Sequence, residues 1–235
     1  MKYLSLFFLL TLVSCHPKDI ENLLNTGASK TLTNQDISNG LKEALDLGVK
    51  QGVNTLSATN GYYESVYKIL LPAEASRVVE KLKIIPVFSG FEQQVIIKIN
   101  LAAEDAVKSA PPIFAKAIRE MTFTDVTNVL MGEKNAATTY LHQKTYTGLY
   151  TEFNPVIVNA LNKFGALDLW RDAITKYNSL PFVEKINPDL DDHVTRKALE
   201  GLFSLIEKKE SGIRQDSLQR SSELLKKVFA RQDKT

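Results

Sequence analysis

The sequence predicts an all-α fold: a single irregular bundle of roughly eight to ten helices. From residue 34 onward, apolar residues recur at spacings of three and four, which is the period of an amphipathic helix. Proline or glycine stands at most of the boundaries between these apolar stripes, where helices begin and end. No alternation of strand and helix patterns is present, and no internal repeat of fixed period.

The first stripe predicts a helix over residues 34–56, with Thr33 or Asn34 as its cap. Residues 62–71 are rich in aromatic and β-branched side chains and precede Pro72, which favours an extended segment. The remaining stripes predict helices over residues 72–82, 86–109, 112–121, 125–131, 136–144, 149–164, 167–177, 194–213 and 224–229.

Local signals set several of these boundaries. Thr124 is the predicted cap of the helix over residues 125–131, and Gly132 is its predicted stop. Pro155 interrupts the stripe over residues 149–164, which predicts either a kink or the start of a new helix, because proline cannot donate the backbone hydrogen bond.

The composition is that of a globular protein and excludes several function classes. Of 235 residues, 44% are hydrophobic and 24% are charged, so the chain can bury a core without a metal or a disulfide. The net charge of +2 gives no reason to expect a nucleic-acid partner. No G-x-S-x-G, H-E-x-x-H or G-x-G-x-x-G motif occurs, and one cysteine with three histidines predicts neither a metal site nor a cofactor.

The amino-terminal residues have the organisation of an export signal. Lys2 precedes an apolar run over residues 4–13, which is too short to span a bilayer but fits the core of a signal peptide. Residues 12–15, Leu-Val-Ser-Cys, resemble the lipobox of bacterial lipoproteins. This resemblance implies that residues 1–14 are removed and that the thiol of Cys15 carries a diacylglycerol.

Other roles for Cys15 have less support. A catalytic cysteine needs a partner base, a metal site needs several ligands, and an ordinary cleaved signal peptide would leave the cysteine incidental. Two or three acyl chains at Cys15 would make membrane anchoring stable. Residues 15–33 are then a lipidated tether, and the protein is expected to be an exported protein held at a membrane of the bacterial cell envelope.

The most acidic cluster directly precedes the predicted helix over residues 194–213. Asp191 and Asp192 can cap this helix, because anions are favoured at a helix N-terminus. Counted from Asp189, the stretch also resembles a calcium loop, but Val194 occupies the position that requires glycine. His193 is a candidate acid or base without a partner that the sequence defines.

Two charged stretches near the C-terminus are interpreted as solvated helix faces. Residues 207–210, Glu-Lys-Lys-Glu, form paired charges on a helix surface. The basic residues of 226–234 alternate with apolar ones as in an ordinary amphipathic helix, although such charges are also attracted to anionic lipid.

Several short stretches follow one another in a characteristic order. They begin at Gly40 (GLKEAL), Asn100 (NLAAEDA), Pro112 (PIF), Met121 (MT), Ala136 (AAT), Phe153 (FNPV), Val194 (VTRKALEGLF), Ile213 (IR) and Leu224 (LLKKVF). Together they resemble a bacterial envelope family catalogued as domain of unknown function 4197. The resemblance covers roughly residues 36–229 and favours one helical domain over residues 34–235. It implies an exported location and no established activity, and His193 stands where an aromatic residue is expected.

Three hypotheses for the function remain open at this point. The first is a lipid-anchored envelope protein that binds an unknown envelope protein or has a structural role. The second is a carrier of an apolar ligand or lipid between its helices. The third is an unrecognised hydrolase that uses Asp191, Asp192 or His193.

Overall fold

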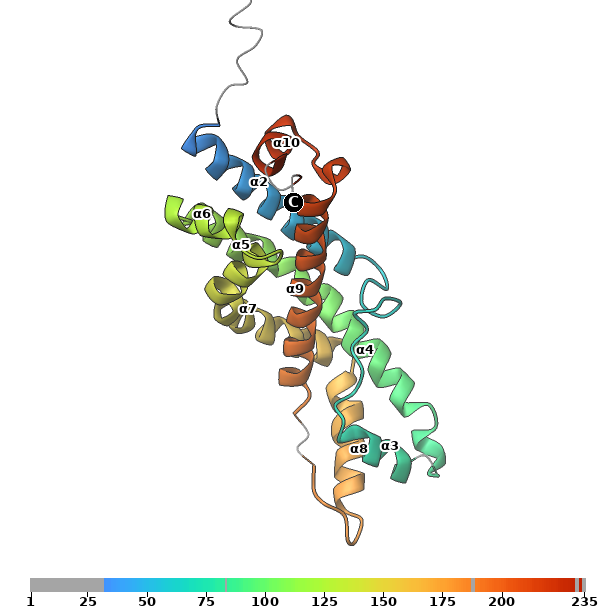
Figure 1. Ribbon diagram of the computed structural model, residues 1–235. Helices are drawn as coiled ribbons and strands as arrows, with labels where there is room; N and C mark the ends of the chain where they lie inside the picture. Colours follow the sequence, from blue (N-terminus) through green and yellow to red (C-terminus); the bar gives the residue numbers. More distant parts are fainter. Residues whose placement is uncertain (1–31, 83, 187–188, 231–232, 234–235) are drawn as a thin grey trace, which may run out of the picture. The chain divides into compact units, whose positions relative to one another are not determined.

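The computed structural model describes residues 32–235 except 83, 187–188, 231–232 and 234–235 (Figure 1). The predicted signal peptide, Cys15 and nearly all of the predicted tether lie outside the described residues. The all-α prediction is confirmed, and the described residues contain no strand. The helices are α2 (Asn34–Leu56), α3 (Ala75–Leu82), α4 (Phe91–Ala106), α5 (Ala110–Arg119), α6 (Phe123–Met131), α7 (Ala136–Lys163), α8 (Ala166–Asn178), α9 (Asp191–Gln215) and α10 (Glu223–Phe229).

Helix α9 lies at the centre of the residues from Asn34 onward, and it packs along both α7 and α2 (Figure 1). The predicted stripes of α2 and α9 point inward, since side chains such as Leu41, Leu56 and Leu202 are at most 1% exposed. Each such side chain contributes about 1.5–3 kcal/mol through its removal from water. The burial of these stripes therefore fixes which face of each helix remains available to a partner.

Several predicted boundaries are wrong. The helix expected from Pro72 begins at Ala75, because residues 72–74 form a turn in which the Ala75 N–H donates to the Pro72 carbonyl at 2.8 Å. The helices expected over residues 136–144 and 149–164 form the single helix α7, which continues through Pro155. Proline removes one backbone hydrogen bond, but the helix on both sides of it is held by buried apolar side chains.

The cap of α6 is also two residues earlier than predicted. Thr122, and not Thr124, accepts a hydrogen bond from the backbone of Asp125 at 3.1 Å, while the Asp125 carboxylate accepts one from the backbone of Thr122 at 2.9 Å. This reciprocal arrangement satisfies two amides that a helix start leaves free. The hydroxyl and amide of Thr122 hold the pKa of the Asp125 carboxyl below its usual range.

Candidate functional site

The predicted polar cluster lies in the first turn of α9. Leu190 is the residue before the helix, so Asp191 and Asp192 are not its caps but its first two residues. Both carboxylates still lie at the positive end of the helix dipole, which favours them there. The side chain of Asp191 accepts a hydrogen bond from Asn154 of α7 at 3.0 Å. The cluster therefore joins the start of α9 to the middle of α7.

Asp192 is the centre of an exposed network with two other side chains. The Nε of Arg196 donates to both of its oxygens at 2.9 and 3.0 Å, and the hydroxyl of Tyr150 donates to one of them. Arg196 also lies over the Tyr150 ring, 5.3 Å from its centroid. The bonds from Arg196 and Tyr150 hold the pKa of Asp192 below its usual range, and the bond to Asp192 raises the pKa of Tyr150.

His193 points away from this network. Its Nε2 lies 2.8 Å from the carbonyl oxygen of Leu70, in the segment between α2 and α3. The three side chains therefore share no partner, and no nucleophile shares a hydrogen bond with His193 among the described residues. The arrangement ties α9 to its neighbours and lacks the converging geometry of a hydrolytic site.

Replacing Asp192 by asparagine is expected to lower the free energy of unfolding by less than about 1 kcal/mol at neutral pH, because the Asp192–Arg196 pair is half exposed. A lowered pKa stabilises the fold above the ordinary pKa of aspartate, and this contribution is lost as the pH falls through the lowered value. Urea unfolding at about pH 7 should therefore separate wild type from Asp192→Asn, while at about pH 2 the two should coincide. A difference of equal size at both pH values would contradict the proposed charge network.

An open groove lies beside His193, between residues 66–71 and the exposed face of α9. Its volume is about 400 Å³. Such a volume lies within the range of ligand sites in proteins, although this groove is open along its length. Its walls consist of Val66, Tyr67, Lys68, Ile69, Leu70 and Leu71 on one side and His193, Lys197, Glu200, Gly201 and Ser204 on the other.

The wall of the groove is held in place by a buried asparagine. Asn100 of α4 is fully buried; its side-chain oxygen accepts from the backbone N–H of Ile69 at 2.8 Å, and its amide donates to the Ile69 carbonyl at 2.8 Å. Both backbone groups of Ile69 thus point to the same side, as they do in an extended strand. The amide of Asn100 also donates to Ile96 within its own helix. The extended segment expected over residues 62–71 is present only around Ile69, because residues 61–67 form turns.

Two further buried contacts fix the start of the segment, one against α9 and one against α4. The hydroxyl of Tyr62 donates to the carbonyl of Ala198 at 2.7 Å, and its backbone N–H donates to the Glu104 carboxylate at 3.3 Å. Burial raises the pKa of Tyr62. At Gly201 a Cβ atom would meet Tyr62 and Tyr67 at 3.1 and 3.3 Å, so only glycine allows so close an approach without displacement. The groove wall is therefore a rigid feature.

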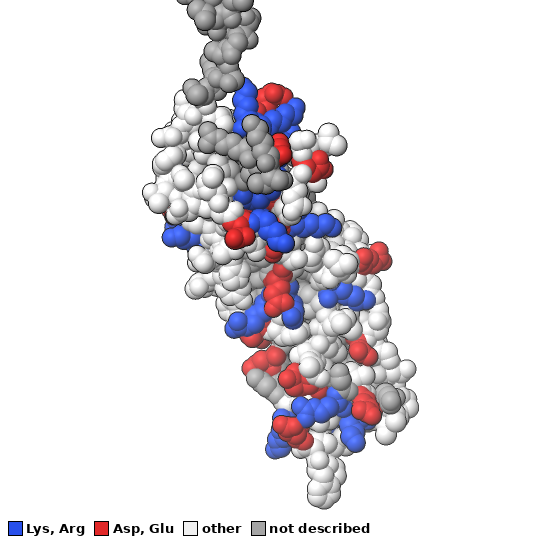
Figure 2. All heavy atoms as spheres, viewed as in Figure 1, with Lys and Arg blue, Asp and Glu red and all other residues white. Residues whose placement is uncertain are grey.

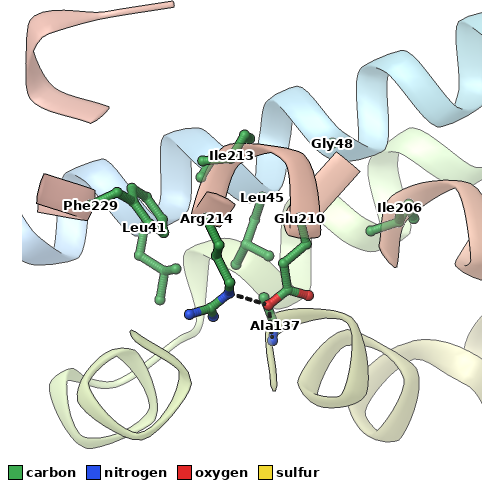
Figure 3. Close-up of a pocket in the computed structure, with 10 residues that line it drawn as sticks. Leu41, Leu45, Gly48, Ala137, Ile206, Glu210, Ile213, Arg214 and Phe229 are labelled. Carbon is green, nitrogen blue, oxygen red and sulfur yellow. Dashed lines mark hydrogen bonds and ion pairs between the residues drawn. The ribbon is translucent and has the colours of Figure 1, made fainter. Parts of the chain in front are cut away.

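A second site is an interior pocket between α2, α7, α9 and α10 (Figure 3). Glu210 and Arg214 project into it from one face of α9, and Nε of Arg214 donates to Glu210 at 2.9 Å. The two side chains are 8% and 6% exposed. Interpreting residues 207–210 as a solvated face is therefore wrong for Glu210, which continues the buried stripe four residues after Ile206.

The buried pair satisfies two helix ends that are distant in sequence. The Glu210 carboxylate accepts the backbone N–H groups of Ala137 and Thr138 at 2.9 and 2.7 Å, in the first turn of α7. Arg214 donates to the carbonyls of Val129 and Leu130 in the last turn of α6 at 2.8 and 3.2 Å. Each charge therefore lies at the end of the helix dipole that it complements. The pair therefore forms a structural joint between α6, α7 and α9.

The interior pocket has little room for a ligand. Its volume is about 20 Å³, enough for roughly one water molecule. A site for a lipid or another apolar ligand typically has several hundred Å³. This pocket therefore does not support the carrier hypothesis.

The visible surface carries charges of both signs. Figure 2 shows basic and acidic side chains interspersed along it, without a large region of one sign. Among the described residues, no helix has the length and apolarity needed to cross a bilayer. The same residues hold no group of three or more histidine, cysteine, aspartate or glutamate side chains placed to bind a metal ion.

Comparison with known proteins identifies a family and nothing more specific. No curated protein and no solved structure matches the chain. A family model described as a protein of unknown function (DUF4197) matches residues 31–230, which is most of the chain and includes both the groove and the buried pair. The resemblance seen in the sequence is confirmed, and the chain belongs to the DUF4197 family of proteins of unknown function.

Proposed function

We propose that this DUF4197 protein is a lipid-anchored binding protein of the bacterial cell envelope. Its acylated Cys15 would hold it at a membrane, and the helical residues from Asn34 onward would present a binding surface to a partner. The observation that carries the proposal is the lipobox-like sequence at residues 12–15, directly behind an apolar run of signal-peptide length.

A binding role is supported by the contrast between the two pockets. The interior pocket is almost filled, whereas the groove beside α9 is open and its wall is held rigidly by Asn100 and Tyr62. A rigid concave surface is suited to recognition because little order is lost when a ligand binds. No observation favours the hydrolase hypothesis, since the side chains of Asp191, Asp192 and His193 do not converge.

Replacing Cys15 by alanine is expected to abolish acylation. In cells fed an alkyne-labelled fatty acid, wild-type chain should carry the label and Cys15→Ala should carry none, because the thiol is the attachment point. Ser14→Ala is the matched control, since alanine is also small and the lipobox pattern is kept. Label that persists in Cys15→Ala would reject the anchor.

A second variant separates lipid anchoring from retention by an uncleaved leader. Residues 1–15 are replaced by a general signal peptide with an A-x-A cleavage site, so that the exported chain begins at His16. This chain is expected in the soluble fraction, while wild type stays with the membranes, because the loss of two or three buried acyl chains removes the anchor. Equal membrane retention of both chains would contradict lipid anchoring.

A further inference from the structure

Residues 68–70 of the groove wall are arranged as in an edge strand, after a turn that ends at Tyr67. Ile69 is buried and its backbone is engaged by Asn100, whereas Leu70 is 59% exposed. In a trans peptide the C=O of one residue and the N–H of the next point in opposite directions. Because the N–H and C=O of Ile69 both face Asn100, the Lys68 carbonyl and the Leu70 N–H point away from it. The N–H of Lys68 instead donates to Ser65 in the preceding turn at 3.2 Å.

The contact with His193 shows that the backbone of Leu70 faces the groove. The His193 ring contacts the carbonyl of Leu70, and His193 lines the groove. The N–H and C=O of one extended residue point the same way, so the N–H of Leu70 faces the groove as well. The hydrogen bonds found among the described residues give neither this N–H nor the Lys68 carbonyl a partner. A donor and an acceptor at strand spacing are thus available.

The charges around the groove indicate which charge a bound ligand should carry. Its walls carry Lys68 and Lys197 against the single carboxylate of Glu200, which is paired with Lys197 at 2.7 Å. Lys68 lies over the Tyr63 ring, 4.0 Å from its centroid, and pairs with no carboxylate among the described residues. The balance at the groove is therefore positive and favours a negatively charged ligand.

We propose that the groove binds an extended acidic peptide segment of a partner protein, which adds to Lys68–Leu70 as a neighbouring strand. The peptide backbone would accept from the Leu70 N–H and donate to the Lys68 carbonyl, and its carboxylate would lie near Lys68. Main-chain bonds supply affinity in this mode of recognition, and the side-chain contacts supply specificity. This inference rests on the proposed binding function and names the partner chemistry of the same groove.

The probe is a displayed library of random decapeptides, selected against the full chain as it is purified from cells in detergent micelles. The peptide recovered most often is then synthesised, and its affinity is measured by fluorescence anisotropy. The inference predicts recovered peptides that are enriched in aspartate and glutamate and lack proline at the paired positions. Because binding is measured on purified protein, a failure of the acylation experiment leaves this result standing, and the reverse also holds.

The decisive pair of variants is Leu70→Pro and Leu70→Ala. Both remove the leucine side chain, but only proline removes the backbone N–H. Proline also favours an extended residue before it, which is the conformation of Ile69, so the wall should be retained. Leu70→Pro is expected to bind the peptide at least about tenfold more weakly than Leu70→Ala, since the peptide carbonyl loses its donor. The two variants should melt within a few degrees of each other, because this N–H bonds to nothing inside the protein.

Hydrogen exchange of the Leu70 amide in wild type provides a second measurement that does not depend on the folding of any variant. The peptide should slow this exchange at least about tenfold. A library that yields no peptide, equal affinity of the two variants, or unchanged Leu70 exchange overturns the inference. Dimers of the chain that form in sedimentation experiments and are dissolved by Leu70→Pro would also overturn it, in favour of pairing between two copies.

Discussion

Replacing Glu210 by alanine is expected to lower the free energy of unfolding by about 3–5 kcal/mol, the range measured when one partner of a buried ion pair is removed. The variant leaves Arg214 charged and 6% exposed, without the carboxylate that lies 2.9 Å from it. It also leaves the amides of Ala137 and Thr138 without their acceptor at the start of α7. These losses are coupled because the bonds belong to one network.

Urea unfolding followed by circular dichroism measures this change. Glu200→Ala is the matched control, because it removes the same side chain from the same helix, where Glu200 forms an exposed pair with Lys197. The control should lose less than about 1 kcal/mol. If Glu210→Ala loses no more than Glu200→Ala, the buried pair does not stabilise the joint between α6, α7 and α9.

The sequence predicts the apolar part of this joint but not its charged part. Ile206, Glu210 and Ile213 follow one another at helical spacing, so the position of Glu210 on the inner face could be read from the stripe. A glutamate at such a position is normally solvated, because burial of a charge costs free energy unless partners are present. The partners here are helix ends more than 70 residues earlier in the chain, and only the tertiary structure brings them to α9.

The sequence pattern does not predict the groove either, for a similar reason. The pattern before Pro72 favours an extended segment over residues 62–71, which is confirmed only around Ile69, since residues 61–67 form turns. Asn100 follows Ile99 in a buried stripe of α4 whose one other charged or amide member is Glu104, which is the only local signal that it serves a buried polar role. Its partner is the backbone of Ile69, and a backbone group carries no sequence signature. Hydrophobic periodicity therefore predicts helices and their buried faces. It does not predict long-range contacts between polar side chains and backbone groups.

Replacing Asn100 by alanine is expected to cost about 2–4 kcal/mol and to release the wall of the groove. The substitution leaves the buried N–H and C=O of Ile69 without partners, and each unsatisfied group costs about 1–3 kcal/mol. Because the segment can recover these bonds only by moving into water, the Ile69 amide should lose its protection against hydrogen exchange. Urea unfolding and exchange at Ile69 measure the two effects.

Asn178→Ala tests whether this effect belongs to the groove. Asn178 makes the same pair of bonds to the backbone of Ile186, both at 3.0 Å, but in a half-buried loop between α8 and α9. Water can replace those bonds, so the control should cost about 1 kcal/mol and leave the exchange of Ile69 unchanged. Equal costs for the two variants, with Ile69 still protected in Asn100→Ala, would mean that the segment is held by Tyr62 and the apolar contacts alone. The distinction matters for function, because a wall that detaches in Asn100→Ala would take the strand edge formed by Lys68 and Leu70 with it.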